Sequence, residues 1–212
     1  MKKTEIIFAV LLLVGLNFKF FLLPFGGTIT TISAMTLSIM YYIFGFAFFN
    51  HIKIKDIFKK EAYKDVSVLR IIGAIGAGIG ISTICIGVLF KVQRWPLAND
   101  NLVVGLSLSL IVFVVAAIRF LKNKNIYYRR ILVRLLIACS IGIIFFKLSN
   151  LDLIKIQFKN HPGYINAYKL YTENPTNDSL RNNLDLEFKK TYMDAETFNG
   201  YLKYLDSKKN KK

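Results

Sequence analysis

The chain has 212 residues, of which 54% are hydrophobic, and its formal net charge is +16. The apolar residues are clustered, which excludes an ordinary soluble domain and indicates a membrane protein. The positive charge could suggest nucleic-acid binding, but it lies in particular loops and is explained by membrane topology, so we expect no nucleic-acid partner.

Five apolar stretches reach or approach the length of about 20 residues that a membrane-spanning helix needs. They cover residues 6–23, 28–49, 71–90, 102–118 and 131–146. The expected fold is therefore all-α, a polytopic membrane protein with five transmembrane helices. The first stretch follows Lys2 and Lys3 as a signal peptide would, but no small-residue cleavage site ends it, so we interpret it as a retained helix.

Basic residues alternate between the connections of these stretches. The connections at 51–70 and 119–130 are rich in Lys and Arg, whereas the first and third hold only Lys19, Lys91 and Arg94. The positive-inside rule then places the N-terminus in the cytoplasm. Five spans place the C-terminal tail in the periplasm of a bacterium, so we expect a protein of the inner (cytoplasmic) membrane.

The first four spans contain an internal repeat. Aligning Gly15 with Gly87 also aligns a Phe, a Lys and a Pro, so that both connections read G-x-x-F-K-x-x-x-x-P. With a one-residue gap, Ser38 then falls on Ser109. We interpret the first four spans as two tandem hairpins in the same orientation. The motif residues are Gly15, Phe18, Lys19 and Pro24 in the first copy, and Gly87, Phe90, Lys91, Arg94, Trp95 and Pro96 in the second.

The chemistry of this motif suits the end of a membrane hairpin. A Lys near the end of a span can extend its ammonium to the headgroups, and Trp95 is typical of the same depth. The Pro cannot donate a backbone hydrogen bond and resists continuing the helix, which fixes the reversal. The alternative interpretation is that Lys91 and Arg94 bind an anionic group or a carboxylate of a partner.

This pattern divides the chain into five parts. They are a first hairpin at 1–50, a basic connection at 51–70, a second hairpin at 71–120, a basic loop with the fifth span at 121–150, and a helical tail at 151–212. The basic connection could be an interfacial helix with Ile54, Ile57, Phe58 and Ala62 on one face, or a solvated loop. We expect Arg134, near the start of the fifth span, to reach the cytoplasmic surface.

The third span opens with the small residues Gly73, Gly76, Ala77 and Gly80. A phosphate-binding loop would need a preceding strand, which an apolar span cannot supply. Small residues at this spacing let helices approach closely in lipid, so we predict a packing face. Cys85 and Cys139 lie in spans without metal-ligand spacing and are interpreted as packing residues.

After residue 150 the composition becomes polar, and three short amphipathic helices are expected at 164–173, 179–192 and 195–205. Asp178 is the expected N-cap of the second. So small a module has little core of its own, so we expect it to lie against the membrane or a partner. We expect residues 208–212 to be disordered.

The second hairpin resembles a known family. The run Ile86 to Pro96, followed by Ala98 and the segment Val104-Gly105-Leu106, is similar to the N-terminal transmembrane hairpin of GldL. GldL is an inner-membrane subunit of the gliding-motility and type 9 secretion motor of Bacteroidota. The resemblance implies a shared membrane module, and the first hairpin would be a degenerate copy without the Trp.

This chain departs from the family at the positions that matter for energy coupling. Family members carry a Glu in the second helix of the hairpin, proposed to couple proton flow to rotation. The aligned position is Ser109, or Ser38 in the first copy. Arg94 stands where the family has a His, and the family's long cytoplasmic coiled region is missing. The resemblance therefore does not imply a motor driven by a carboxylate at this position.

From these features we expect a non-catalytic membrane component that assembles with other membrane subunits or with itself. The alternative is a small transporter or channel built from the tandem repeat, although no span has a charged residue at its centre. No catalytic residues, cofactor, metal ligands or small-molecule substrate are predicted. The bilayer itself is the other expected partner.

Overall fold

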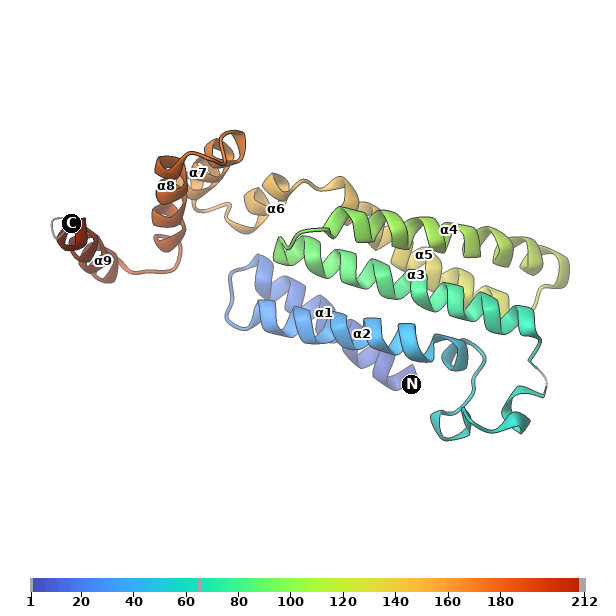
Figure 1. Cartoon of the computed structure of the whole chain (residues 1–212). Coiled ribbons are helices and arrows are strands. Elements are labelled where there is room, and N and C mark those ends of the chain that lie inside the picture. The colour runs from blue at the N-terminus through green and yellow to red at the C-terminus, as the bar shows by residue number, and fades with distance from the viewer. Residues whose placement is uncertain (1, 65, 210–212) are drawn as a thin grey trace. The chain divides into compact units, whose positions relative to one another are not determined.

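The prediction of an all-α membrane protein is confirmed in its class. The computed structural model describes residues 2–64 and 66–209, and every element in these residues is helical. The chain forms two compact units, Met1–Ser149 and Asn150–Lys212. Figure 1 labels the helices of both units.

The first unit is a bundle of long helices. Its members are α1 (Lys2–Phe20), α2 (Gly26–Phe49), α3 (Val68–Gln93), α4 (Ala98–Asn123) and α5 (Ile126–Lys147). Helix α3 is central and packs against α2, α4 and α5, whereas α1 packs mainly against α2. A helix of 26 residues, such as α3, is about 39 Å long, which exceeds the hydrocarbon thickness of about 30 Å.

Two different ends can be distinguished in this bundle (Figure 1). The start of α1, segment 50–67 and the α4–α5 connection lie at one end, which we call the basic end because most of the lysines and arginines of this unit gather there. The α1–α2 and α3–α4 connections lie at the opposite end, which we call the turn end. Both hairpins therefore have the same orientation.

Not every helix of the first unit has the length and hydropathy of a membrane span. Helices α2, α3 and α4 are each long and apolar enough to cross a membrane, and a fourth span is reached if α5 and α6 (Asn150–Gln157) are counted together. Helices α1 and α5 are apolar in their middles, but charged residues near their ends reduce their hydropathy. The count of five spans stays a prediction.

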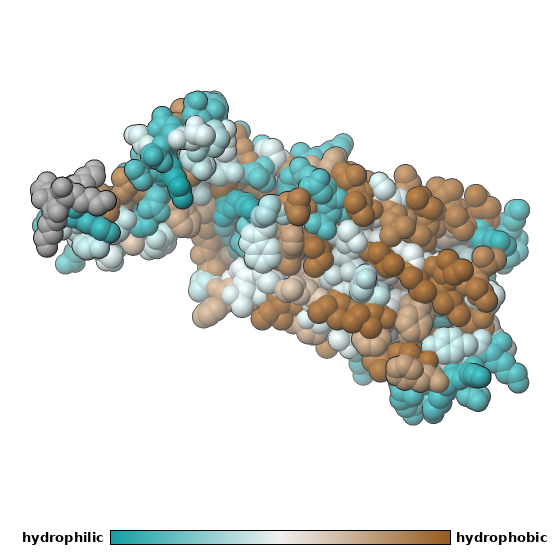
Figure 2. Space-filling model, in the orientation of Figure 1, coloured by the Kyte–Doolittle hydropathy of each residue, from teal (hydrophilic) through white to brown (hydrophobic). Residues whose placement is uncertain are grey.

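The bundle is held together by apolar side chains on the inner helix faces. One cluster contains Tyr41, Phe48, Ala77, Ile81 and Leu135, and a second contains Ile84, Val88, Val92 and Leu102. The outer surface is also apolar, as Figure 2 shows by the hydrophobic residues along the helices. In water such a surface would aggregate, whereas in a bilayer it meets lipid.

Segment 50–67 is a loop with two short 3₁₀ turns, Ile54–Asp56 and Lys60–Tyr63. Among its described residues these turns are three and four residues long, which is too short for a helix with one apolar face. Of the two interpretations of this connection, the structure favours the basic loop. The Lys59 ammonium hydrogen-bonds to Asp56 and holds the pKa of that carboxyl below its ordinary value.

The second unit contains α6, α7 (Pro162–Glu173), α8 (Asp178–Lys189) and α9 (Ala195–Lys209). Helix α6 was not predicted. The small core of this unit is aromatic. Phe158 is 2% exposed and stacks edge-on against Tyr164, with ring centroids 4.5 Å apart. Helix α8 is shorter than the predicted range.

Two finer predictions for this unit are corrected. The N-cap of α8 is Asn177 rather than Asp178, because the Asn177 side chain accepts from the backbone N–H groups of Ser179 and Leu180. Residues 208 and 209, expected to be disordered, belong to α9. Residues 210–212, in the same expectation, lie outside the described part of the chain.

Candidate functional site

The two hairpin turns have matching backbone geometry. The alignment of Gly15 with Gly87 also places Leu22 on Arg94, and these residues have left-handed φ values of 57° and 59°. It places Phe25 on Leu97, with φ values of 63° and 61°. The shared Pro lies between the two left-handed residues in each turn. Left-handed backbone is unusual in residues other than Gly, so its recurrence at two aligned positions indicates that the two turns share one structure.

The backbone hydrogen bonds of the two turns match as well. The N–H of Leu23 donates to Phe18 O at 2.8 Å, and the aligned N–H of Trp95 donates to Phe90 O at 2.8 Å. Each bond closes the end of its helix in the pattern of a Schellman motif. The Phe–Pro spacing that the two copies share therefore has a structural reason. The helix ends just after the Phe, and the Pro fixes the reversal of the chain.

The motif glycines lie where the two helices of each hairpin approach closely. A Cβ atom on Gly15 would lie 2.7 Å from the backbone nitrogen of Thr30, and one on Gly87 would lie 3.0 Å from that of Leu102. Thr30 and Leu102 follow their glycines at the same sequence separation. Neither position has room for a side chain unless the hairpin opens.

The two motif lysines bind polar side chains of the neighbouring helices. Lys91 is 4% exposed, and its ammonium donates to Asn99 Oδ1 at 2.7 Å. The Lys19 ammonium donates to Gln93 Oε1, whose amide in turn donates to Thr31 Oγ1 at 2.8 Å. Lys91 therefore points to the turn end, as expected. Protein atoms enclose its ammonium, and its hydrogen bond to Asn99 joins α3 to α4.

The aromatic and cationic members of the motif lie on the surface of the second turn. Trp95 is 45% exposed and stacks edge-on against Phe90, with ring centroids 5.3 Å apart. An indole half in water and half against apolar side chains suits the membrane interface. Arg94, which replaces the family's His, is the left-handed residue at the C-cap of α3.

The small residues of α3 contact two different helices. Gly80 lies against Ser109 of α4, and a Cβ atom on Gly76 would lie 3.0 Å from Val112 of α4. Gly73 has only Tyr127 Oη near it, at 3.8 Å. Gly78, which was not predicted, faces α2, where its own Cβ position is blocked by Tyr41 and Gly45. The close approaches of α3 thus include Gly78, which the sequence did not indicate, and do not include the predicted Gly73.

The two serines at the predicted coupling positions are buried in helix contacts. Ser109 is 0% exposed, and a Cβ atom on Gly80 would collide with its hydroxyl. Ser38 Oγ lies 2.7 Å from Ser82 Oγ and also donates to Ser82 O, which joins α2 to α3. A serine hydroxyl does not supply a proton at ordinary pH, so neither position holds an acid that could replace the family's Glu.

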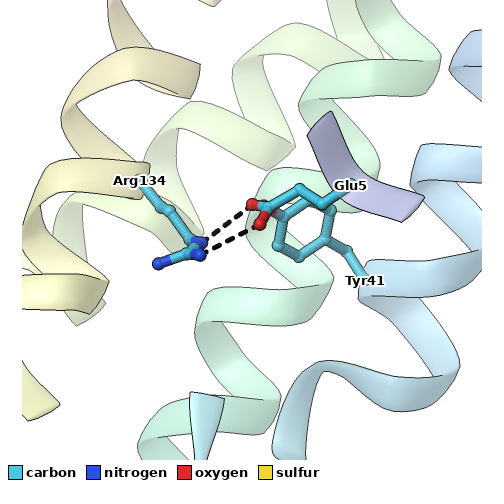
Figure 3. Close-up of polar contacts among 3 residues, drawn as sticks. All are labelled: Glu5, Tyr41 and Arg134. Carbon is cyan, nitrogen blue, oxygen red and sulfur yellow. Dashed lines mark hydrogen bonds and ion pairs between the residues drawn. The ribbon is translucent and has the colours of Figure 1, made fainter. Parts of the chain in front are cut away.

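A charged cluster that the sequence did not predict lies nearer the basic end (Figure 3). Glu5 of α1 and Arg134 of α5 form a two-bond ion pair, with Arg134 Nε 2.8 Å from Glu5 Oε1 and Arg134 Nη2 3.0 Å from Glu5 Oε2. The Tyr41 hydroxyl of α2 donates to the same carboxylate. The Arg134 guanidinium also lies over the Phe48 ring, 4.8 Å from its centroid.

The expectation that Arg134 reaches the cytoplasmic surface is wrong. Its side chain is 22% exposed and turns inward to Glu5, whose side chain is 15% exposed. Arg134 lies eight residues into α5, about 12 Å from the start of the helix at 1.5 Å per residue. A charge at this depth is expensive in lipid unless a partner neutralises it, and Glu5 does so.

An apolar groove continues from this cluster towards the turn end. Its volume is about 650 Å³. Helices α1 and α5 form its walls, and residues of α2 and α3 form its floor. The lining residues are apolar apart from Glu5, Tyr41 and Arg134 at one end and the thiol of Cys85. Since α1 and α5 flank this groove, the ion pair bridges it near the basic end.

In the described part of the chain, no three His, Cys, Asp or Glu side chains are grouped so that they could hold a metal ion. Cys85 and Cys139 are free thiols in half-buried positions between helices. Cys139 lies beside the hydroxyl of Ser109.

Sequence reasoning missed the charged cluster because it treated each span separately. The first span was expected to begin at residue 6, immediately after Glu5, whereas α1 begins at Lys2. The available signal was the combination of one acid at the start of an apolar helix and one Arg well inside another. Opposite charges in two spans indicate a pair, because lipid makes each costly alone.

Comparison with known proteins adds one finding. The family model described as the GldL N-terminal domain matches residues 76–136, from the middle of α3 through α4 to Leu136 in α5. A search of curated proteins and a search of solved structures each found no match. The matched segment contains the second hairpin turn, Ser109 and Arg134, and it excludes Glu5 and Tyr41.

The predicted resemblance is therefore confirmed for the part of the chain that carried it. The matched segment is a bent-back pair of long apolar helices followed by the first half of a third. Over residues 76–136, this membrane protein is similar to the GldL N-terminal domain.

Proposed function

We propose that this protein is a non-catalytic component of the bacterial inner membrane that assembles with other membrane subunits or with itself. The observation that carries the proposal is the GldL N-terminal match over an apolar helical hairpin. The extended apolar surface of α4, with Val104 59% and Ile111 63% exposed, is available for contacts within the membrane. The similarity to the GldL N-terminal domain supports a proposed role of this component in gliding motility or type 9 secretion in Bacteroidota.

We further propose that the first hairpin is a second copy of the GldL-type hairpin. The support is the matched left-handed residues and the matched hydrogen bonds of the two turns. In this arrangement α5 follows the second copy as an additional helix. The N-terminus and segment 50–67 would lie in the cytoplasm and the tail unit in the periplasm.

The module is proposed to lack proton coupling at the family's position. Ser109 is buried against Gly80, and Ser38 is occupied by its hydrogen bonds to Ser82. Glu5 lies in the first turn of α1, and both of its oxygens accept from Arg134. A carboxylate held in this way joins α1 to α5.

Proton flux in proteoliposomes tests this part of the proposal. Vesicles containing the protein and a pH-sensitive dye receive a proton gradient and a valinomycin-clamped potential. We expect the flux to equal that of empty vesicles, both for the natural chain and for Glu5→Gln. Flux through the natural chain that Glu5→Gln abolishes would show that Glu5 carries protons and would overturn the proposal.

Assembly is tested in the native membrane. A membrane-permeant amine crosslinker is applied to cells that express the tagged protein at its natural level, and the tagged species are sized after denaturation. We expect discrete crosslinked bands above the monomer of 24.3 kDa. A single monomer band, under conditions that crosslink a known membrane complex in the same cells, would count against the proposal.

A further inference from the structure

We infer that the groove between α1 and α5 is a binding site for one acyl chain of a phospholipid, with the phosphate at the Arg134 end. The inference rests on the proposed membrane placement, but it does not depend on which subunits the protein assembles with. It follows from the length of the groove, its volume and the chemistry of its two ends.

The groove is as long as one leaflet of a bilayer is thick. Along α1 it runs from Glu5 to Leu16, and along α5 from Arg134 to Phe145. Each wall therefore advances eleven residues (16 − 5 and 145 − 134), which is about 16 Å at 1.5 Å per residue. Half of the hydrocarbon core is about 15 Å thick. A single acyl chain matches this length, whereas a partner helix would contact the full depth of the membrane.

The volume also favours a chain over a helix. The groove holds about 650 Å³, which is within the range of about 300–1,000 Å³ that small-molecule sites occupy. A spanning helix about 30 Å long and 10 Å across fills roughly 2,400 Å³. The exposed residues that line the groove, including Leu13 and Ile137, have flexible apolar side chains. Close contacts between membrane helices favour small residues instead.

The charged end has the groups that a phospholipid headgroup needs. Arg134 binds Glu5 through Nε and Nη2, while its Nη1 makes no bond to Glu5 and points away from it (Figure 3). A guanidinium can donate to a phosphate oxygen while keeping a carboxylate bound, because its donors lie on different edges. The far end, near Leu16 and Phe145, has only apolar side chains and suits a terminal methyl group.

Photocrosslinking with a defined lipid tests the site. The purified full chain is placed in nanodiscs that contain a phosphatidylglycerol with a diazirine midway along one acyl chain. After irradiation, the labelled peptides are mapped by mass spectrometry. We expect severalfold more labelling on the groove residues of α1 and α5 than on the lipid-facing residues Val104 and Ile111 of α4. Equal labelling of all three helices would mean ordinary bilayer contact and would overturn the inference.

A variant that fills the groove gives an independent readout. Ala9 lines the groove, so Ala9→Phe should abolish the preferential labelling, whereas Val104→Phe on the exposed face of α4 is the matched control and should leave it unchanged. If Ala9→Phe does not fold, the labelling map of the natural chain still decides the question. Preferential labelling that persists in folded Ala9→Phe would contradict the site.

A second copy of the chain is the competing occupant. Leu13→Cys, in a chain whose two natural cysteines are replaced by Ala, should form no disulfide-linked dimer in nanodiscs under oxidation. Dimer formation through Leu13→Cys would assign the groove to a helix of another copy and overturn the lipid inference. Neither a dimer through Leu13→Cys nor the loss of lipid labelling would contradict the proposed assembly function, so the two proposals can fail separately.

Discussion

Glu5 and Arg134 are 129 residues apart in the chain, and both carboxylate oxygens of Glu5 accept hydrogen bonds from the Arg134 guanidinium. Because α1 packs mainly against α2 and α5 packs against α3 and α4, this pair is the polar link between the first helix and the last helix of the bundle. Tyr41 adds a second donor to the carboxylate, so the pair is held within a small network.

Removing one member of this pair should destabilise the bundle. In Arg134→Gln or Glu5→Gln the remaining charge stays mostly buried without its partner, which costs roughly 3–5 kcal/mol for buried pairs and less here because both side chains are partly exposed. We expect the double variant Glu5→Gln/Arg134→Gln to lose less than the sum of the two single losses. The free energy of unfolding in mixed detergent micelles is measured for the natural chain, the two single variants and the double variant.

Arg129 provides the control for this cycle. It is exposed in the first turn of α5, so Arg129→Gln should change the unfolding free energy little. Additive losses in the double variant would show that Glu5 and Arg134 do not stabilise each other in solution.

The contact between Gly80 and Ser109 should tolerate no added methyl group. In Gly80→Ala the new Cβ collides with the Ser109 hydroxyl, and α3 and α4 must separate, at a cost of about 1–3 kcal/mol. Ser109→Gly in the same chain should restore part of the loss, because it removes the colliding side chain. Thermal unfolding followed by circular dichroism in detergent measures both effects.

Gly73→Ala is the matched control on the same helix, since the nearest atom to its Cβ position is Tyr127 Oη at 3.8 Å. We expect it to be neutral or slightly stabilising, because Ala favours the helix. Equal losses from Gly73→Ala and Gly80→Ala would mean that helix propensity or general packing, rather than the Ser109 contact, decides the outcome.

The left-handed residues of the turns offer a stabilising substitution. Leu97 has a φ of 61° and is 65% exposed, so Leu97→Gly relieves backbone strain and removes little packing. We expect a gain of up to about 1 kcal/mol, since left-handed backbone costs an L-residue about 1–2 kcal/mol and Gly is more flexible when unfolded. Leu97→Ala keeps the Cβ and should show no gain. A loss of stability in Leu97→Gly relative to Leu97→Ala would contradict the proposed strain.

Cysteine labelling in cells tests the orientation of the bundle. Both natural cysteines lie between helices and can be replaced by Ala. A membrane-impermeant maleimide should label Ser179→Cys of the tail in intact cells whose outer membrane has been permeabilised. It should label Lys55→Cys, in segment 50–67, only after the inner membrane is opened. The opposite pattern would invert the proposed topology.

The sequence was sufficient for the features that depend on local pattern. The spacing of Phe18, Lys19 and Pro24, repeated in the second hairpin, corresponds to helix ends closed by the same hydrogen bonds. Apolar runs indicated the long helices because the bilayer imposes one length on every span. The resemblance to GldL rested on residues within the segment that the family model matches.

Features that depend on contacts between distant helices could not be predicted in this way. Gly78 differs little from Gly76 in sequence context, and only the position of α2 shows that Gly78 faces Tyr41. Likewise, the inward direction of Arg134 depends on where α1 places Glu5. The two short turns of segment 50–67 escaped prediction because an amphipathic pattern of Ile and Lys is compatible with a helix, and the pattern does not show where the chain reverses.

The mass of the protein particle in its native lipid tests the central claim most directly. Membranes are extracted with a nanodisc-forming polymer, without detergent, and the tagged particles are analysed by native mass spectrometry. We predict a particle that contains either several copies of the 24.3 kDa chain or a fixed number of other membrane subunits. Particles that contain one copy of the chain, lipid and no other protein would contradict the claim that it is an assembly component.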